Sequence, residues 1–222
     1  VFGEAYKQLN LKKTDLFVLG ADFRHYEVIH RNLIWASRVA GSTSFGGSRL
    51  IYYLGSVDNW INLSTRVPTF DNSIPIDPNG HYAYQALATN MRGFVQGARN
   101  GNNFTVINNE IRWPFVKYFA NYPISSSFWN SLQVVGFFDA GSAWTGLTPF
   151  SGKNAYDHDV ITNSSGNVSV TLDSNRSPIL YGYGFGFRAQ ILGYFMRFDW
   201  AWGIENKVIL PRIFYLSLNL DF

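Results

Sequence analysis

Arg92 is followed by a single acid on each of the next two segments that are predicted to be extended. These acids are Glu110, in residues 109–114, and Asp139, in residues 137–141, and both have apolar and aromatic neighbours. The planar guanidinium group of arginine binds carboxylates through parallel hydrogen bonds, so an arginine that meets two carboxylates in a confined space forms a rigid ion-pair network. The sequence therefore predicts that Glu110 and Asp139 together hold Arg92.

Other residue types that commonly carry chemistry do not form a recognisable site. The sequence has no cysteine, and no Gly-x-Ser-x-Gly motif surrounds any serine. The histidines lack the close spacing of metal ligands, and no patterned acid stands beside them; they are His25, His30, His81 and His158. We therefore expect no catalytic residue, no metal and no cofactor, and we expect that the protein is not an enzyme.

The composition narrows the class of protein. The 222 residues are enough for one domain, and 18% of them are aromatic whereas only 15% are charged. A soluble domain has about 25% charged residues, so this chain covers its surface with something other than charge. A net charge of +3, with no cluster of basic residues, argues against a nucleic-acid partner. No apolar run reaches the ~18 residues of a membrane helix, so a membrane-spanning chain would have to cross with strands.

The clearest strands lie at the end of the chain. Residues 214–222 alternate apolar and polar side chains, and residues 196–203 repeat this period of two, which predicts two β-strands. On these two strands alone, the core of a soluble β-sandwich is an alternative explanation of the apolar face. Residues 180–191 favour a barrel instead, because aromatic residues share one face while Gly182, Gly184 and Gly186 share the other. Bare backbone leaves room for an inserted segment, and an aromatic outer face suits lipid.

The remaining segments complete a pattern of about eight strands. The further predicted strands span residues 2–8, 16–26, 33–41, 104–115 and 132–143. Short links near residues 30–32 and 192–193 alternate with long links at 42–103, 145–178 and 205–212. Short turns on one side and long loops on the other are typical of bacterial outer-membrane barrels. The link at 117–131 is an exception, because it should be short and is not.

Several motifs, taken in order, resemble the Omp85 superfamily, the bacterial surface antigen family of barrel-assembly and translocation pores. Met91-Arg92-Gly93-Phe94 resembles the family's (V/I)RG(F/Y) motif at the tip of a long extracellular loop. Leu54-Gly55 resembles the LGG element before it, although Ser56 stands where the family prefers glycine. Glu110 falls where the family has an acid on the following strand, and residues 138–144 resemble its FxDxGxxW strand, with Asp139 as the acid.

The last two predicted strands and the strand before them extend this resemblance. Residues 182–188 look like the family's glycine-rich antepenultimate strand, and residues 197–199 look like its RFDYA-type penultimate strand. Leu218, Leu220 and Phe222 resemble the C-terminal signal for insertion into the outer membrane. We predict that Arg197 and Asp199 form an inward-facing cross-strand charge pair that lines a wet lumen.

The resemblance implies an all-β, transmembrane antiparallel barrel of roughly sixteen strands, of which residues 1–222 are the C-terminal part, with an inserted extracellular loop at about 42–103. It also implies integral location in the bacterial outer membrane and a role in outer-membrane protein assembly or protein translocation. The implied partners are outer-membrane lipid, client outer-membrane or secreted proteins, and periplasmic assembly partners. The alternative is a passive, porin-like barrel, or one that anchors a working domain preceding this sequence.

Overall fold

The computed structural model describes residues 2–7, 15–64, 68–76, 80–120, 122–151, 154, 158–162, 169–173, 176–191 and 193–219. The chain belongs to the all-β class, with 61% of residues in strands and 6% in helices. Most strands belong to one nine-stranded antiparallel sheet. Its members are β1 (Phe2–Lys7), β2 (Asp15–His30), β3 (Leu33–Gly46), β7 (Asn103–Trp113), β8 (Gln133–Trp144), β11 (Leu180–Ile191), β12 (Tyr194–Glu205), β13 (Val208–Ile209) and β14 (Ile213–Asn219).

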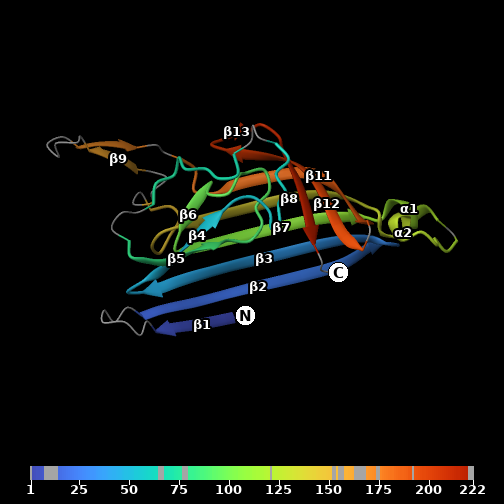
Figure 1. Ribbon diagram of the computed structural model, residues 1–222, viewed down its shortest axis with the longest axis horizontal. Helices are drawn as coiled ribbons and strands as arrows, with labels where there is room; N and C mark the ends of the chain where they lie inside the picture. The colour runs from blue at the N-terminus through green and yellow to red at the C-terminus, as the bar shows by residue number, and fades with distance from the viewer. Residues whose placement is uncertain are drawn as a thin grey trace.

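The long strands of this sheet lie side by side in nearly the order of the sequence (Figure 1). The order is β1-β2-β3-β7-β8-β11-β12, after which both β13 and β14 pair with β12. Each strand of the sequence-based prediction is present within a few residues. Within the described part of the chain, β1 and β14 lie at opposite edges, and the sheet does not close on itself.

The connections follow the predicted alternation. Short links join β2 to β3 and β11 to β12, whereas long links join the opposite ends of the strands. The segment between β3 and β7 contains β4 (Arg49–Leu54), β5 (Tyr82–Leu87) and β6 (Arg99–Gly101), which form a separate three-stranded sheet. The predicted loop boundary at residue 42 was early, because β3 continues to Gly46. The long link after β8 also contains the hairpin of β9 (His158–Thr162) and β10 (Ser169–Asp173).

The unusually long link between β7 and β8 contains two short helices, α1 (Phe115–Phe119) and α2 (Ser127–Ser131). They lie at the end of the sheet opposite to β4, β5 and β6 (Figure 1). Packing of Trp113 against Phe115 and Phe119 explains why this link is not a simple turn. Among the described residues, no helix is long and apolar enough to cross a membrane.

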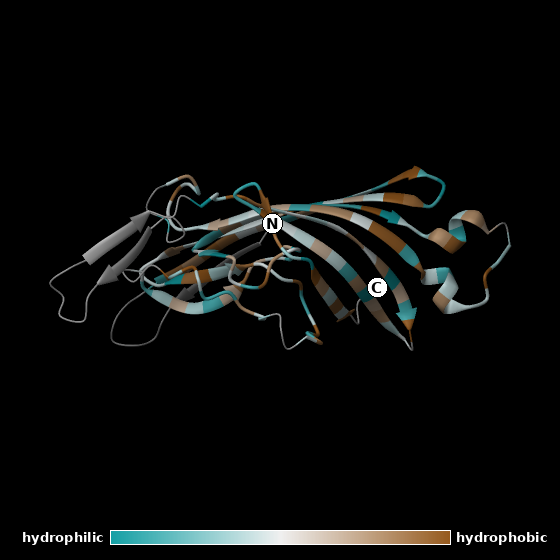
Figure 2. Ribbon diagram, turned by 90° about the horizontal axis from the view of Figure 1, so that it is seen from above, coloured by the Kyte–Doolittle hydropathy of each residue, from teal (hydrophilic) through white to brown (hydrophobic). Residues whose placement is uncertain are grey.

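The nine-stranded sheet has two different faces, which appear in Figure 2 as alternating hydrophobic and hydrophilic bands along the strands. The outer face carries large apolar side chains that remain exposed. They include Phe17, Leu19, Phe23, Val39, Ile107, Phe138, Tyr181 and Phe185. Their aromatic rings stack across strands, as in Phe185 against Trp200 at 5.6 Å between ring centroids. Exposed apolar surfaces of this extent are typical of faces that contact another protein or a membrane.

The inner face is covered by the segment between β3 and β7. The main apolar cluster lies between this segment and the sheet, and it includes Tyr52, Leu54, Met91, Phe94, Val106 and Leu180. Strand register places one row of inner-face residues directly across six strands. The row consists of Arg24, Arg38, Asn108, Asp139, Gly182 and Gly203. This row brings an acid beside two positions without side chains, and the tip of the inserted segment lies there.

Candidate functional site: the Arg92 network

A pair of antiparallel backbone contacts presents the loop tip to the sheet. The amide of Met91 donates to the carbonyl of Ser56 at 3.0 Å, and the amide of Ser56 donates to the carbonyl of Phe94 at 2.8 Å. Gly93 has φ 91°, a left-handed conformation that glycine adopts without steric cost. A Cβ atom at Gly93 would also lie 2.6 Å from the amide nitrogen of Gly203. The Arg-Gly sequence therefore allows the turn and its close approach to β12.

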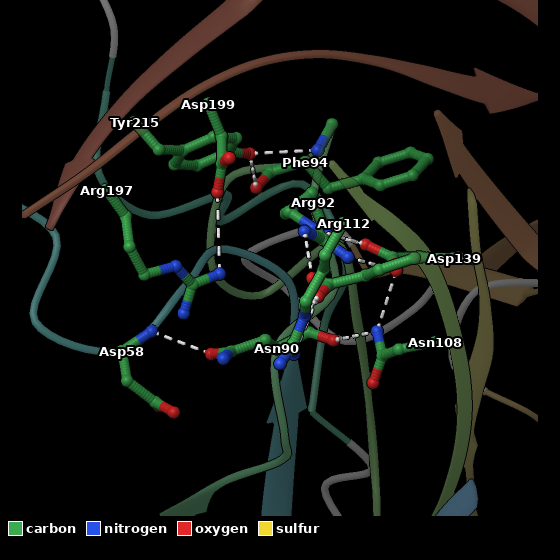
Figure 3. A network of polar contacts seen from close by, with 12 residues as sticks. Asp58, Asn90, Arg92, Phe94, Asn108, Arg112, Asp139, Arg197, Asp199 and Tyr215 are labelled. Atoms are coloured by element: carbon green, nitrogen blue, oxygen red, sulfur yellow. Dashed lines mark hydrogen bonds and ion pairs between the residues drawn. The ribbon is translucent and has the colours of Figure 1, made fainter. Parts of the chain in front are cut away.

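Arg92 bonds to both acids that the sequence pointed to, and Figure 3 shows Arg92 beside Asp139. Its Nε and Nη2 donate to Asp139 Oδ2 and Oδ1, each at 2.7 Å, which makes a two-point contact. Its Nη1 donates to Glu110 Oε1, also at 2.7 Å. The backbone amide of Arg92 adds a bond to Asp139 Oδ2 at 3.2 Å. We name Arg92, Glu110 and Asp139 the Arg92 network.

The Arg92 network is almost completely buried. Arg92, Asp139 and Glu110 are 1%, 0% and 8% exposed, respectively. The guanidinium carbon of Arg92 lies 3.7 Å from the centre of the Phe137 ring, which covers one side of the cation. Burial alone would lower the pKa of Arg92, but the adjacent Asp139 and Glu110 carboxylates outweigh it, so its pKa is raised. The site is therefore a buried ion cluster in which Arg92 stays protonated.

Further polar residues on the inner face complete the network. Arg188 Nη2 donates to Glu110 Oε1 at 2.6 Å, and Arg112 Nε donates to Glu110 Oε2 at 2.9 Å. Asn108 donates to Asp139 Oδ1 at 2.8 Å and to the carbonyl of Asn90 at 3.0 Å. Both carboxylates thus accept from several donors, which offsets the cost of removing them from water. The sequence analysis assigned no role to Arg112 or Arg188.

The three glycines of β11 do not all face the loop, which corrects part of the sequence-based interpretation. A Cβ atom at Gly182 would overlap the carbonyl oxygen of Arg92, so this glycine does admit the loop. A Cβ at Gly184 would lie 2.7 Å from the Phe137 ring, and one at Gly186 would overlap the Asp199 carboxylate. These two glycines make room for side chains and for backbone carbonyls of the neighbouring strands, Trp200 at Gly184 and Phe198 at Gly186. Strand register and the size of neighbouring side chains decide which glycine contacts the loop. The alternation of residues in the sequence could not predict this.

A second bare position, Gly203 on β12, was missed. A Cβ atom there would lie 2.5 Å from the carbonyl oxygen of Gly93 and 2.8 Å from the ring of Phe94. Gly203 and Gly182 are paired in register, so together they make the shallow surface that receives the loop tip. In residues 196–203, Gly203 alternates in phase with the polar residues, and this position could have identified it as part of the inner face.

Tyr215 on β14 is a second residue that the sequence analysis missed. Its hydroxyl accepts from the amide of Gly93 at 3.0 Å and donates to the carbonyl of Phe94 at 2.7 Å. The residue is 0% exposed, and Trp60 of the inserted segment packs against its ring at 5.1 Å. Its position among polar residues of the terminal strand could have singled it out.

Another buried arginine fixes the base of the inserted segment. Arg99, on β6, is 1% exposed, and its Nη2 donates to Glu205 at the end of β12 at 2.8 Å. The same group donates to the carbonyl of Ser177 at 2.6 Å. The inserted segment is therefore fastened by one ion cluster at its tip and another ion pair near its return to the sheet.

The element Leu54-Gly55-Ser56 runs beside the loop tip. Gly55 has φ 126° and Ser56 has φ 68°, so two consecutive residues are left-handed. Ser56 stands where the resembled family prefers glycine, and its conformation is one that glycine adopts most easily. Ser56 therefore adopts a backbone conformation that glycine adopts more easily than serine does.

Two further sequence-based expectations have a different outcome. Arg197 and Asp199 do face inward, but they lie on the same strand, with a contact of 3.4 Å, so the predicted cross-strand pairing was wrong. Leu218 lies on β14 opposite Met196 and belongs to the predicted C-terminal signal. The other two residues of that signal, Leu220 and Phe222, lie outside the described residues.

Comparison with known proteins leaves the site to be interpreted from its geometry. No protein-family model matches the chain, and no curated protein matches it. The arrangement of the Arg92 network supplies positional restraint. All its carboxylate oxygens accept hydrogen bonds from arginine or asparagine, which suits holding a segment in place.

Proposed function

We propose that the chain forms part of a transmembrane β-barrel in the bacterial outer membrane, with additional strands completing the wall between β1 and β14. The uncovered apolar outer face supports this proposal, because it matches the lipid-facing surface of such barrels. The polar inner face, covered by an inserted segment, supports it as well. Short links at one end and long links at the other give the periplasmic and extracellular ends, respectively.

Within that class, we propose an Omp85-like role in the assembly of outer-membrane proteins or in protein translocation. The observation that carries this proposal is the contact of Arg92 with Asp139 and Glu110 at 2.7 Å. The arginine comes from a Met-Arg-Gly-Phe tip, and the acids come from consecutive strands of the inner face, in the order of the resembled family. The partners are outer-membrane lipid, client outer-membrane or secreted proteins, and periplasmic assembly partners.

The edge of β14 suggests how a client strand would be received. One edge of β14 pairs with β12. On the opposite edge, the carbonyl of Leu216 accepts a hydrogen bond from the amide of Ile61 at 2.7 Å. Trp60 forms an isolated antiparallel bridge with Ser217. An incoming strand could add to this edge by β-augmentation only after these two loop residues leave it. The inserted segment thus covers part of the edge that a client would use.

Depletion of the protein in its native bacterium tests the assembly role. We expect depletion to lower the amounts of other folded outer-membrane proteins, measured by their heat-modifiable migration. In separate cells that express the Leu218→Cys variant, this cysteine should crosslink to client proteins during their assembly. The chain has no natural cysteine, so the crosslink is specific. Unchanged outer-membrane protein levels, together with no client crosslink, would contradict the assembly role.

A passive pore or membrane anchor is the second candidate, and the rigidity of the Arg92 network favours it. The loop tip is bonded to β7, β8 and β14 at once, and a gate would have to break these contacts. Single-channel recordings in planar bilayers separate the candidates. A steady open conductance, in cells that assemble their outer membrane normally without the protein, would establish the passive role.

A further inference from the structure

Five strands of the sheet each place one arginine on the inner face, beside the Arg92 network. Strands β2, β3, β7, β11 and β12 contribute them. They are Arg24, Arg38, Arg112, Arg188 and Arg197, and we name them the arginine belt. Among the described residues, the outer face carries no comparable group of arginines, and apolar side chains dominate it. The proposed assembly function assigns it no task.

The arginine belt faces a cavity of about 540 Å³ beneath the inserted segment. The opposite side of the cavity is formed by Asp58, Asn59 and Asn90 of that segment. Six arginines line the cavity, including Arg92, against two acids, Asp58 and Glu110. A cavity of this size accommodates a small-molecule ligand. The lining of the cavity is rich in hydrogen-bond donors and in positive charge.

Strand register places two pairs of like charges directly opposite each other. Arg24 is opposite Arg38, and Arg188 is opposite Arg197. Like charges in directly opposed positions repel each other unless an anion lies between them. Asp22 fills that role for the first pair, because it accepts from Arg38 Nη2 at 2.7 Å and from Arg24 Nη2 at 3.0 Å.

The second pair has much less compensation. Arg188 shares Glu110 with Arg92 and Arg112, and Arg197 reaches Asp199 only at 3.4 Å. The Nε atoms of both Arg188 and Arg197 are buried and have no hydrogen-bond partner within the described part of the chain. Arg188 is only 4% exposed. Buried donors of this kind are costly when they are unsatisfied, and both arginines also line the cavity.

We propose that the arginine belt is a binding site for a soluble oxyanion with several negative charges. Arg188 and Arg197 form its floor, and Arg24, Arg38 and Arg112 attract the ligand from the open side. Arginine is well suited to this ligand, because its planar donors match the oxygens of carboxylate and phosphate groups. Rings of arginine perform the same selection in anion pores. The site requires only the inner face and the inserted segment, so it is independent of the assembly role.

Titration of the purified, detergent-solubilised protein with pyrophosphate tests this site by calorimetry. We expect saturable binding that strengthens from chloride to phosphate to pyrophosphate and weakens as salt is added. Arg197→Gln should weaken pyrophosphate binding about tenfold, because it removes a charge-assisted donor. Arg31→Gln is the matched control, since Arg31 is exposed in the β2–β3 turn and lies outside the cavity. This variant should bind pyrophosphate with the affinity of the wild type.

A second variant protects the test against loss of folding. Arg24→Gln removes a half-exposed member of the belt, with its side chain 55% exposed, and it should weaken binding severalfold while the protein keeps its thermal transition. Arg197→Lys, which keeps the charge, should bind more tightly than Arg197→Gln. The inference is overturned if the wild type binds pyrophosphate no better than chloride. It is also overturned if the folded belt variants bind as tightly as Arg31→Gln.

Discussion

Two ion clusters on the same inner face have opposite stoichiometry and different exposure. In the Arg92 network, one arginine meets two acids, and all three residues are buried. In the second cluster, which we name the Asp22 cluster, one acid meets Arg24 and Arg38. The side chains of Asp22, Arg24 and Arg38 are 26%, 55% and 25% exposed. The shortest contact is 2.7 Å in both clusters.

Equal distances therefore do not mean equal contributions to stability. Water screens the Asp22 cluster, so its pairs contribute little to the free energy of unfolding. The Arg92 network is buried, and removal of Arg92 would leave Asp139 without a cation in a medium of low polarity, although Glu110 would keep Arg112 and Arg188. The difference explains why the buried cluster can hold a loop in one position whereas the exposed one tunes the charge of the inner face.

The largest effect is expected for Arg92→Ala, which leaves Asp139 and Glu110 without their shared cation. We expect a loss on the order of 3–5 kcal/mol in the free energy of unfolding, measured by denaturant titration in detergent. Proteolysis of the loop should also accelerate. Arg49→Ala, at an exposed arginine of β4, is the control and should change neither quantity appreciably. A loop that stays equally protected in Arg92→Ala would refute its dependence on the Arg92 network.

Gly182→Ala tests whether the bare wall is needed for the buried cluster. The added methyl group would overlap the Arg92 carbonyl and displace the loop tip, at a cost of about 1–3 kcal/mol. Gly136→Ala is a matched control on the neighbouring strand, because its Cβ would meet no atom within 4 Å. Thermal unfolding should separate the two variants, and equal midpoints would show that the loop does not need Gly182.

Tyr215→Phe removes a single hydroxyl group from the contact between β14 and the loop tip. The Gly93 amide and the Phe94 carbonyl would each lose a partner in a buried environment, which predicts a loss of about 1–2 kcal/mol. Tyr181→Phe, on the exposed outer face, should be close to neutral. Hydrogen exchange of the Gly93 amide reports the effect directly, and unchanged protection would rule out the hydroxyl contact.

The smallest effect is expected for Asp22→Asn, which disrupts the exposed cluster without touching the buried one. We expect less than about 1 kcal/mol of destabilisation, and that difference should shrink at high salt because exposed charges are screened. Unfolding titrations at low and high ionic strength measure it. A loss as large as that of Arg92→Ala would remove the distinction between the two clusters.

Sequence patterns anticipated most of the sheet because alternation is a local property. Residues 180–191, for example, read as a strand from their spacing alone and form β11 with the same ends. The link between β7 and β8 was harder, since α1 depends on the packing of Trp113 against Phe115 and Phe119 rather than on a helical repeat. Helix α2 bonds through Ser127 and Ser131 to Gln190 of β11, which is distant in the sequence. The hairpin of β9 and β10 also lay inside a segment that reads only as a polar loop.

The sequence by itself determined the strand pattern, the aromatic outer face, and the choice of Arg92, Glu110 and Asp139 as partners. Isolated charges among apolar neighbours need counter-charges, and this requirement is visible in one dimension. Only the tertiary structure decided the rest, including the contact of Tyr215 with the loop tip and the pairing of Arg188 with Arg197. These arrangements depend on strand register, because register sets which inner-face residues stand opposite each other across the sheet.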